Sequence, residues 1–100
     1  MKVILTEAAY TDLHQIGKSI KQDSFRRAET FVAELYHKCQ QLSFMPLAFP
    51  LLPNWEDTGI RRRVHGKYLI FYLINGENVE VLHVLHGAMD YEKVLFGEQG

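Results

Sequence analysis

The chain has 100 residues, of which 47% are apolar and 23% are charged, and these values are typical of one globular domain. Its 11 basic and 12 acidic side chains leave a net charge of −1, which argues against a protein that binds nucleic acid through a broad electrostatic footprint. The single cysteine allows neither an internal disulfide nor a multi-thiol metal site, so we expect a cytoplasmic protein in a reducing compartment.

The N-terminus predicts a short strand rather than an export signal. Val3–Leu5 is a brief apolar run, and the polar residues Thr6 and Glu7 follow it at once, so the apolar core of a signal peptide is missing. Thr6 is also a suitable N-cap for a helix that begins directly after the strand.

Two amphipathic helices are predicted next. The first places four apolar residues on one face by helical spacing: Ala9, Leu13, Ile16 and Ile20. Asp23 and Ser24 interrupt this pattern and can cap a second helix. That helix has its own apolar stripe, in which Cys39 is expected to be inert core: Ala28, Phe31, Val32, Leu35, Cys39 and Leu42. The short connection predicts an antiparallel helical hairpin whose stripes must pack against something else.

The segment from Phe44 to Thr58 predicts an irregular hydrophobic loop that packs over the edge of the core. Pro46, Pro50 and Pro53 prevent regular structure in it. Trp55 in this loop is a candidate contact residue, which either anchors a partner or shields the core.

Three strands and a short helix follow. Residues 60–65 alternate in the manner of a strand, and Tyr68–Ile74 is apolar on both faces, as a central strand is, yet too short to span a membrane. Asn75-Gly76 predicts a hairpin turn into a strand over Val79–Leu85, which Gly87 ends. Asp90–Phe96 predicts a helix. The order β-α-α-β-β-β predicts an α+β domain over residues 1–100: an N-terminal strand, an antiparallel helical hairpin on a small antiparallel sheet, and a short C-terminal helix.

Two segments of the C-terminal third carry a family resemblance. Gly66–Tyr72 reads GKYLIFY and Val79–Tyr91 reads VEVLHVLHGAMDY, and together they resemble ParE-type toxins of the RelE/ParE toxin-antitoxin superfamily. The arginine strand at 61–63, the two helices and the proline-containing loop agree in outline. The resemblance implies a type II toxin, also called a plasmid stabilisation toxin, that inhibits DNA gyrase by binding, needs no cofactor and is neutralised by a ParD-like antitoxin.

The related RelE branch implies another activity, the ribosome-dependent cleavage of mRNA. That chemistry needs a general base, a general acid and cations around the phosphate. RelE-type nucleases have an arginine in the central strand, and matching that strand by its closing Phe71-Tyr72 puts Leu69 at the arginine position. We therefore expect a binding inhibitor and not an enzyme. A ribonuclease that uses other basic residues and a degenerate, harmless homologue remain as alternatives.

Seven residues are candidates for contact with an antitoxin or a target: Arg61, Arg63, His65, Lys67, His86, Tyr91 and Trp55. The first three share one strand face, opposite Ile60 and Val64, and we expect that face to be exposed to solvent. There they form either a solvated edge that prevents aggregation or hot spots of an interface. Tyr91 either contacts a partner or fixes the C-terminal helix to the sheet.

Other signals point away from metals, cofactors and nucleic acid. His83 and His86 lie three residues apart on a strand, so they should face opposite sides, with His83 beside Val81 and Leu85 in the core. Met89 stands where many relatives have a basic residue. We expect no catalytic residue, no metal, no direct nucleic-acid binding and no membrane contact. An antitoxin should bring an amphipathic segment onto the helical hairpin or onto the Phe44–Trp55 loop.

Overall fold

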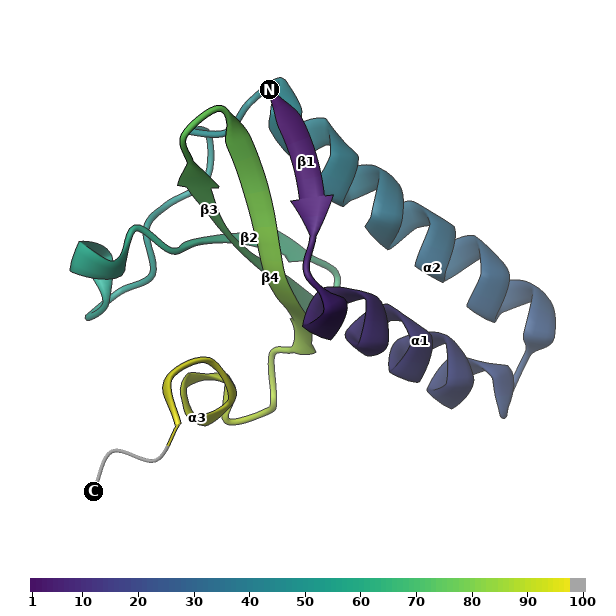
Figure 1. The fold of residues 1–100 in the computed structure, drawn as a ribbon. Helices are drawn as coiled ribbons and strands as arrows, with labels where there is room; N and C mark the ends of the chain where they lie inside the picture. Colours follow the sequence, from purple (N-terminus) through teal and green to yellow (C-terminus); the bar gives the residue numbers. More distant parts are fainter. Residues whose placement is uncertain (98–100) are drawn as a thin grey trace.

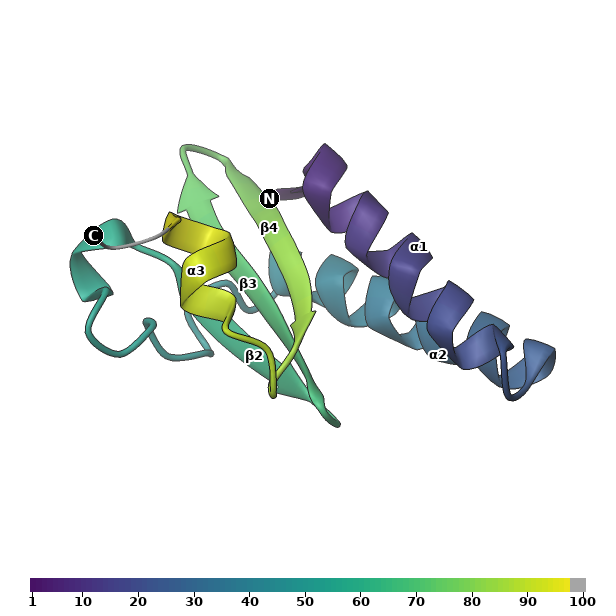
Figure 2. The same ribbon diagram turned by 90° about the horizontal axis from the view of Figure 1, so that it is seen from below.

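The computed structural model describes residues 1–97, which form a four-stranded sheet with a helical hairpin on one face and a short helix on the other (Figures 1 and 2). Residues 98–100 of the expected domain lie outside this described part. The elements follow in the order β1 (Lys2–Leu5), α1 (Glu7–Lys21), α2 (Phe25–Gln40), β2 (Arg61–His65), β3 (Tyr68–Asn75), β4 (Asn78–His86) and α3 (Tyr91–Phe96). The predicted α+β class and the predicted order of elements are therefore confirmed.

The sheet has the strand order β1-β4-β3-β2, so β3 is central and β2 is an edge strand. β2 pairs with β3, and β3 with β4, in the antiparallel sense, as predicted. β1 instead pairs with β4 in parallel. A parallel pair needs a long connection, which the helical hairpin and the other two strands supply here.

The turn between β3 and β4 lies one residue later than the sequence predicts. Asn75 pairs with Asn78, so the two central turn residues are Gly76 and Glu77. Gly76 has a φ of 61°, while Glu77 keeps a negative φ. A two-residue hairpin of this kind needs a positive φ at its first central residue, and glycine adopts it without strain.

Both predicted helix caps are present. The Thr6 hydroxyl accepts a hydrogen bond from the Ala9 amide at 3.1 Å and donates to the Leu82 carbonyl at 2.9 Å, which ties the start of α1 to β4. The Ser24 hydroxyl accepts from the Arg27 amide at 3.2 Å at the start of α2. The caps satisfy amides that the first turn of a helix leaves without an intrahelical partner.

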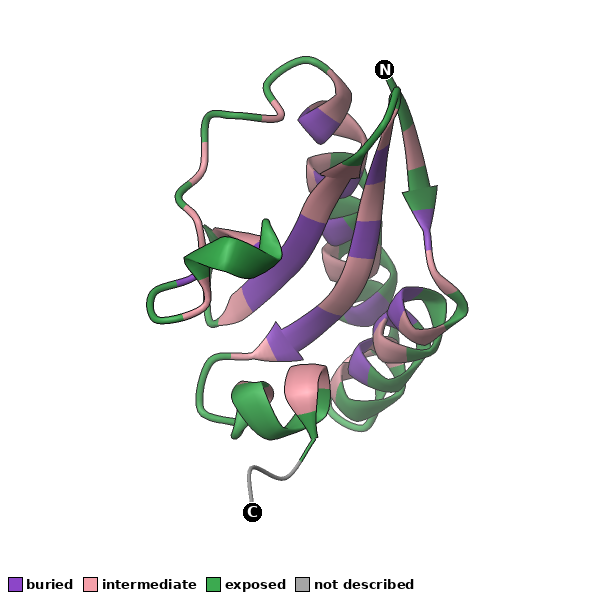
Figure 3. Ribbon diagram, turned by 60° about the vertical axis from the view of Figure 1, so that its left-hand side comes forward, coloured by how far each residue is buried: buried purple, intermediate pink, exposed green. Residues whose placement is uncertain are grey.

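Buried residues form one cluster on each face of the sheet. Figure 3 shows in purple the buried parts of the strands and of the two long helices. The first lies between the sheet and the helical hairpin and contains the predicted stripes of both helices except Ala28, which is buried but lies outside this cluster. The second lies on the opposite face, where α3 and the loop before β2 cover Leu69 and Phe71. None of the helices in residues 1–97 is long and apolar enough to cross a membrane.

Most of the 44–58 loop packs over the core, but its first residues do not. Leu52 is buried in the second cluster, and Trp55 packs against that cluster. Phe44 and Leu47, in contrast, are 86% and 68% exposed. Phe49 packs against the first cluster, so the prediction that this loop covers the core edge is correct from Phe49 onward and wrong for Phe44 and Leu47.

Candidate functional site

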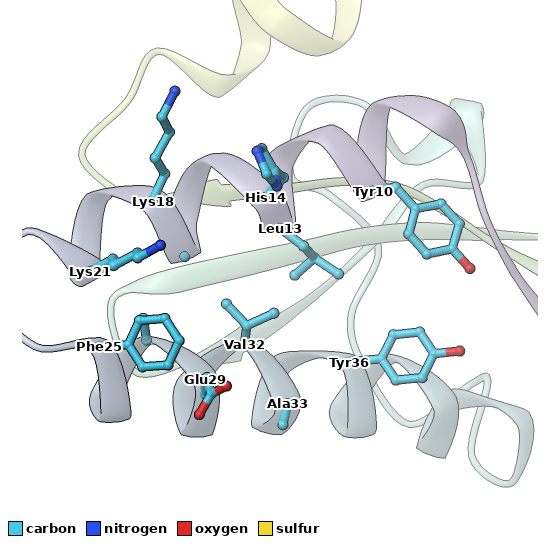
Figure 4. A pocket seen from close by; sticks show the side chains of 12 residues that line it. Tyr10, Leu13, His14, Lys18, Lys21, Phe25, Glu29, Val32, Ala33 and Tyr36 are labelled. Carbon is cyan, nitrogen blue, oxygen red and sulfur yellow. The ribbon is translucent and has the colours of Figure 1, made fainter.

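The helical hairpin carries an apolar groove of about 690 Å³ between α1 and α2, on their solvent-facing side (Figure 4). Leu13 and Val32 point toward each other across its centre. Tyr10, Phe25 and Tyr36 stand along it with exposed fractions of 53%, 57% and 41%. Large apolar side chains exposed along one groove in this way are typical of a binding surface.

A glycine and several charged side chains define the shape and polarity of the groove. A Cβ atom on Gly17 would lie 3.1 Å from Val32 Cγ2, so the glycine allows the two helices to approach closely at that point. Lys18 and Lys21 line the α1 side, while Glu29 lies on the α2 side. The Lys21 ammonium lies 5.0 Å from the centroid of the Phe25 ring. The α1 rim is therefore cationic beside an apolar floor.

Sequence reasoning did not select the groove aromatics as site residues. A signal for them exists, because Tyr10, Phe25 and Tyr36 are large apolar residues at helical positions outside the two core stripes. A helix with large apolar side chains on its outer face has a second surface that can pack against a partner.

The prediction that Arg61, Arg63 and His65 lie on a solvent-exposed face of β2 is wrong. Arg61, Arg63 and His65 do share a face, but it is the face that meets the helical layer. Arg61 Nη1 donates to the Phe49 carbonyl at 2.8 Å, and Arg63 Nη1 donates to the Lys38 carbonyl at 3.1 Å. The exposed position is Val64, at 61%. Long cationic side chains on an edge strand can reach backbone acceptors of the neighbouring layer. These hydrogen bonds explain why the arginines point toward that layer and not toward solvent.

His65 belongs to the same face and contacts α2. Its ring stacks on Phe31 with a centroid distance of 5.9 Å, and its Nε2 lies 3.4 Å from Glu34 Oε2. The structure thus gives three of the predicted contact residues internal partners.

Tyr91 and Trp55 hold α3 against the sheet. The Tyr91 ring lies 5.2 Å from the Phe71 ring, and the Tyr91 hydroxyl accepts a hydrogen bond from Arg62 Nη1 at 3.3 Å. The Trp55 ring stacks on Phe96 at a centroid distance of 3.8 Å. Its Nε1 donates to Glu92 Oε2 at 2.9 Å. Each residue thus has the packing contacts of one of the two interpretations that the sequence left open, and its contact with a partner stays a prediction.

Lys67 and His86 lie together at the other end of the sheet, beside the α1–α2 connection. Both line a second hollow, of about 590 Å³. The His86 ring contacts Tyr68 edge to face at 5.2 Å, and its Nδ1 accepts a hydrogen bond from the Ala88 amide at 3.0 Å. Among the predicted residues, these two are therefore the ones that line an open pocket.

The sequence predicts His83 on the same side of the sheet as Val81 and Leu85, and this prediction is wrong. Leu82 forms a β-bulge, so Val81 belongs to the core cluster under the helices and Leu85 to the opposite one. His83 Nδ1 instead donates to Asp12 Oδ2 at 2.8 Å, and the same oxygen accepts from the Val84 amide at 2.9 Å. Within residues 1–97 no three His, Cys, Asp or Glu side chains are grouped so that they could hold a metal ion.

Two buried side chains have raised pKa values. Burial raises the pKa of the Cys39 thiol to about 12, against a smaller opposing effect of the Arg63 charge. Burial likewise raises the pKa of Tyr72, whose hydroxyl donates to the Pro46 carbonyl at 2.8 Å. Both groups stay protonated at neutral pH, so Cys39 is not available as a thiolate nucleophile.

Comparison with known proteins agrees with this fold. A family model described as the ParE toxin of the type II toxin-antitoxin system parDE matches residues 3–91. A solved structure of the chromosomal ParDE system from P. aeruginosa has a chain with a TM-score of 0.74 and 17% identity, covering 86% of this chain and 95% of that one. A chain of the RelBE2 toxin-antitoxin complex from Mycobacterium tuberculosis has a TM-score of 0.63 and 26% identity, covering 85% and 95%. No curated protein matches by sequence.

Proposed function

The chain belongs to the ParE toxin family of type II toxin-antitoxin systems, and from this membership we propose that it is a toxin that inhibits DNA gyrase in the cytoplasm by binding it. The match over residues 3–91 carries the proposal, because it runs from the second residue of β1 to the first residue of α3 and so includes both long helices and the other three strands. The second part of the proposal is that a ParD-like antitoxin holds the toxin inactive.

The arrangement of charges on the sheet favours binding over RNA cleavage. Leu69 is 8% exposed and packs in the cluster that contains Phe71 and Leu85, so its position offers no cation to a phosphate. Arg61 and Arg63 direct their guanidinium groups to backbone carbonyls of the loop and of α2. Phosphoryl transfer needs cations that converge on the reacting group, and these side chains are turned to internal acceptors instead.

The target is tested with the purified chain in a gyrase supercoiling assay and a gyrase-dependent DNA cleavage assay. We expect inhibition of supercoiling at concentrations similar to those that arrest growth. Mapping of mRNA 5′ ends after induction provides the opposite test. Cuts inside codons at the ribosomal A site, with gyrase unaffected, would contradict this proposal and identify the chain as a RelE-type ribonuclease. Absence of growth arrest would instead identify a degenerate homologue.

The hairpin groove is the surface that we propose for the antitoxin. It is apolar along its floor and flanked by Lys18 and Lys21 on the α1 side. An amphipathic segment fits it best if its apolar residues face the groove and acidic residues lie along its α1 edge. A like-charged segment would meet repulsion from the same lysines.

Two exposed phenylalanines provide a matched test of this surface. Phe25 lines the groove, and Phe44 is exposed in the loop that the sequence names as the other candidate. Phe25→Asp should weaken binding of the antitoxin encoded beside this gene by roughly 30-fold, the effect of losing one hot spot. Phe44→Asp should leave binding unchanged. The reverse pattern would move the antitoxin to the loop, and melting temperatures of the two variants control for misfolding.

A further inference from the structure

The second hollow lies where three connections of the chain meet. The turn between β2 and β3 contributes Gly66 and Lys67, and the end of β4 contributes His86. The α1–α2 connection contributes Asp23, and the first turn of α2 contributes Arg27. Its volume of about 590 Å³ lies in the range of pockets that hold small molecules. It shares no lining residue with the apolar groove of the hairpin.

Four aromatic rings in contact form a row, and three of them line this hollow. His65 stacks on Phe31 at 5.9 Å, Phe31 lies 5.4 Å from Tyr68, and Tyr68 lies 5.2 Å from His86. Phe31, Tyr68 and His86 line the hollow itself, and each is partly exposed there. Partly exposed aromatic side chains that line a hollow can form a platform on which a flat, aromatic ligand stacks.

The hollow also has an excess of positive charge. Arg27 and Lys67 are exposed cations, and Asp23 is the acidic residue among the lining side chains. The two ion pairs found within residues 1–97 join His65 to Glu34 and His83 to Asp12, so neither Arg27 nor Lys67 is in contact with a carboxylate. His86 adds a donor, because the Ala88 amide donates to Nδ1 and the ring proton of the neutral form must therefore be on Nε2.

We propose that this hollow is a binding site for a nucleotide, with the base stacked on the rings and the phosphate held by Arg27 and Lys67. The combination of a stacking platform with adjoining cations is the one by which proteins hold nucleotides and single strands without reading their sequence. The net charge of −1 argues against a broad electrostatic footprint, but a site for one phosphate does not need one. The inference does not depend on the gyrase proposal.

The test is an NMR titration of the full chain with probes that separate the two parts of the ligand. Adenosine monophosphate should shift the amide signals of Lys67, Tyr68 and Gly87. It should bind at least about tenfold more tightly than adenosine or inorganic phosphate alone, since each lacks one of the two contacts. A single-stranded oligonucleotide with a 5′-phosphate that binds more tightly than the mononucleotide identifies a nucleic-acid end as the source. Binding no tighter identifies the free nucleotide.

Two pairs of variants localise the effect. Lys67→Gln and Arg27→Gln should each weaken binding of adenosine monophosphate by about tenfold, the loss of one charged contact. Lys2→Gln and Arg26→Gln remove the same charges outside the hollow and should leave the affinity unchanged. Equal losses in all four variants would mean nonspecific attraction and overturn the proposal. It is also overturned if phosphate binds as tightly as the mononucleotide, or if no signal near Lys67 shifts.

Discussion

Replacement of Arg63 tests whether the arginines of β2 stabilise the fold. Arg63 Nη1 donates to the Lys38 carbonyl at 3.1 Å, in the last turn of α2, and its guanidinium carbon lies 4.7 Å from the centroid of the Phe49 ring. A hydrogen bond from a charged donor contributes about 1.5–3 kcal/mol. A cation–π contact adds about 0.5–1 kcal/mol. Arg63→Met keeps much of the aliphatic stem, so we expect it to lower the free energy of unfolding by about 2–3 kcal/mol.

The assay is urea denaturation followed by circular dichroism. Arg26→Met is the matched control, because Arg26 is an exposed residue near the other end of α2. It should change the free energy of unfolding by less than about 0.5 kcal/mol, as surface substitutions usually do. Arg63→Lys should recover part of the loss, since lysine keeps the charge but not the planar donor group. Equal stability of Arg63→Met and Arg26→Met would refute the structural role of Arg63 and would favour the interpretation that this face of β2 is solvated.

Three further predictions concern buried contacts. Because the Cys39 thiol has a pKa of about 12 when folded and ionises near 9.0 when exposed, stability should fall between these pH values by up to about 1.4 kcal/mol per pH unit. Unfolding at several pH values should show a shallower fall for Cys39→Ala, and an unchanged slope would contradict the assignment. Tyr72→Phe removes the hydrogen bond to the Pro46 carbonyl and should lower the free energy of unfolding, measured by urea denaturation, by about 1 kcal/mol. A gain in stability would show that this hydrogen bond does not stabilise the fold. Phe96→Ala should shift the emission of Trp55, the single tryptophan, to longer wavelength, whereas unchanged emission would mean that α3 does not shield this ring.

Elements that depend on local patterns could be predicted from the sequence. The stripe that includes Leu13 and Ile16 has the period of a helix, and Thr6 supplies the hydroxyl that its first turn requires. The run Tyr68–Ile74 is apolar on both faces, which is the signature of the central strand that it forms. Each of these signals is carried by neighbours in the sequence, so one chain is enough to read it.

The position of His83 could not be predicted, because it depends on one extra residue in a strand. Regular alternation puts Val81, His83 and Leu85 on one side. The bulge at Leu82 reverses the alternation, so Val81 and Leu85 pack on opposite faces of the sheet. The string VEVLHVLH contains no glycine or proline that would mark the bulge. The position of the bulge depends on pairing with β3 and on the Thr6 hydroxyl, which donates a hydrogen bond to the Leu82 carbonyl.

The arginines of β2 show why a charged strand is a poor guide to a functional surface. β2 has one neighbouring strand, β3, and on its other edge a single backbone bridge joins Arg61 to Leu51, so side-chain contacts add to its attachment. Arg61 and Arg63 provide these contacts to the loop and to α2 on one face, and Arg62 provides one to Tyr91 of α3 on the other. Three consecutive cations thus join the sheet to both of its covering layers. Loss of toxicity on their substitution would therefore report loss of the fold unless stability is measured in the same variants.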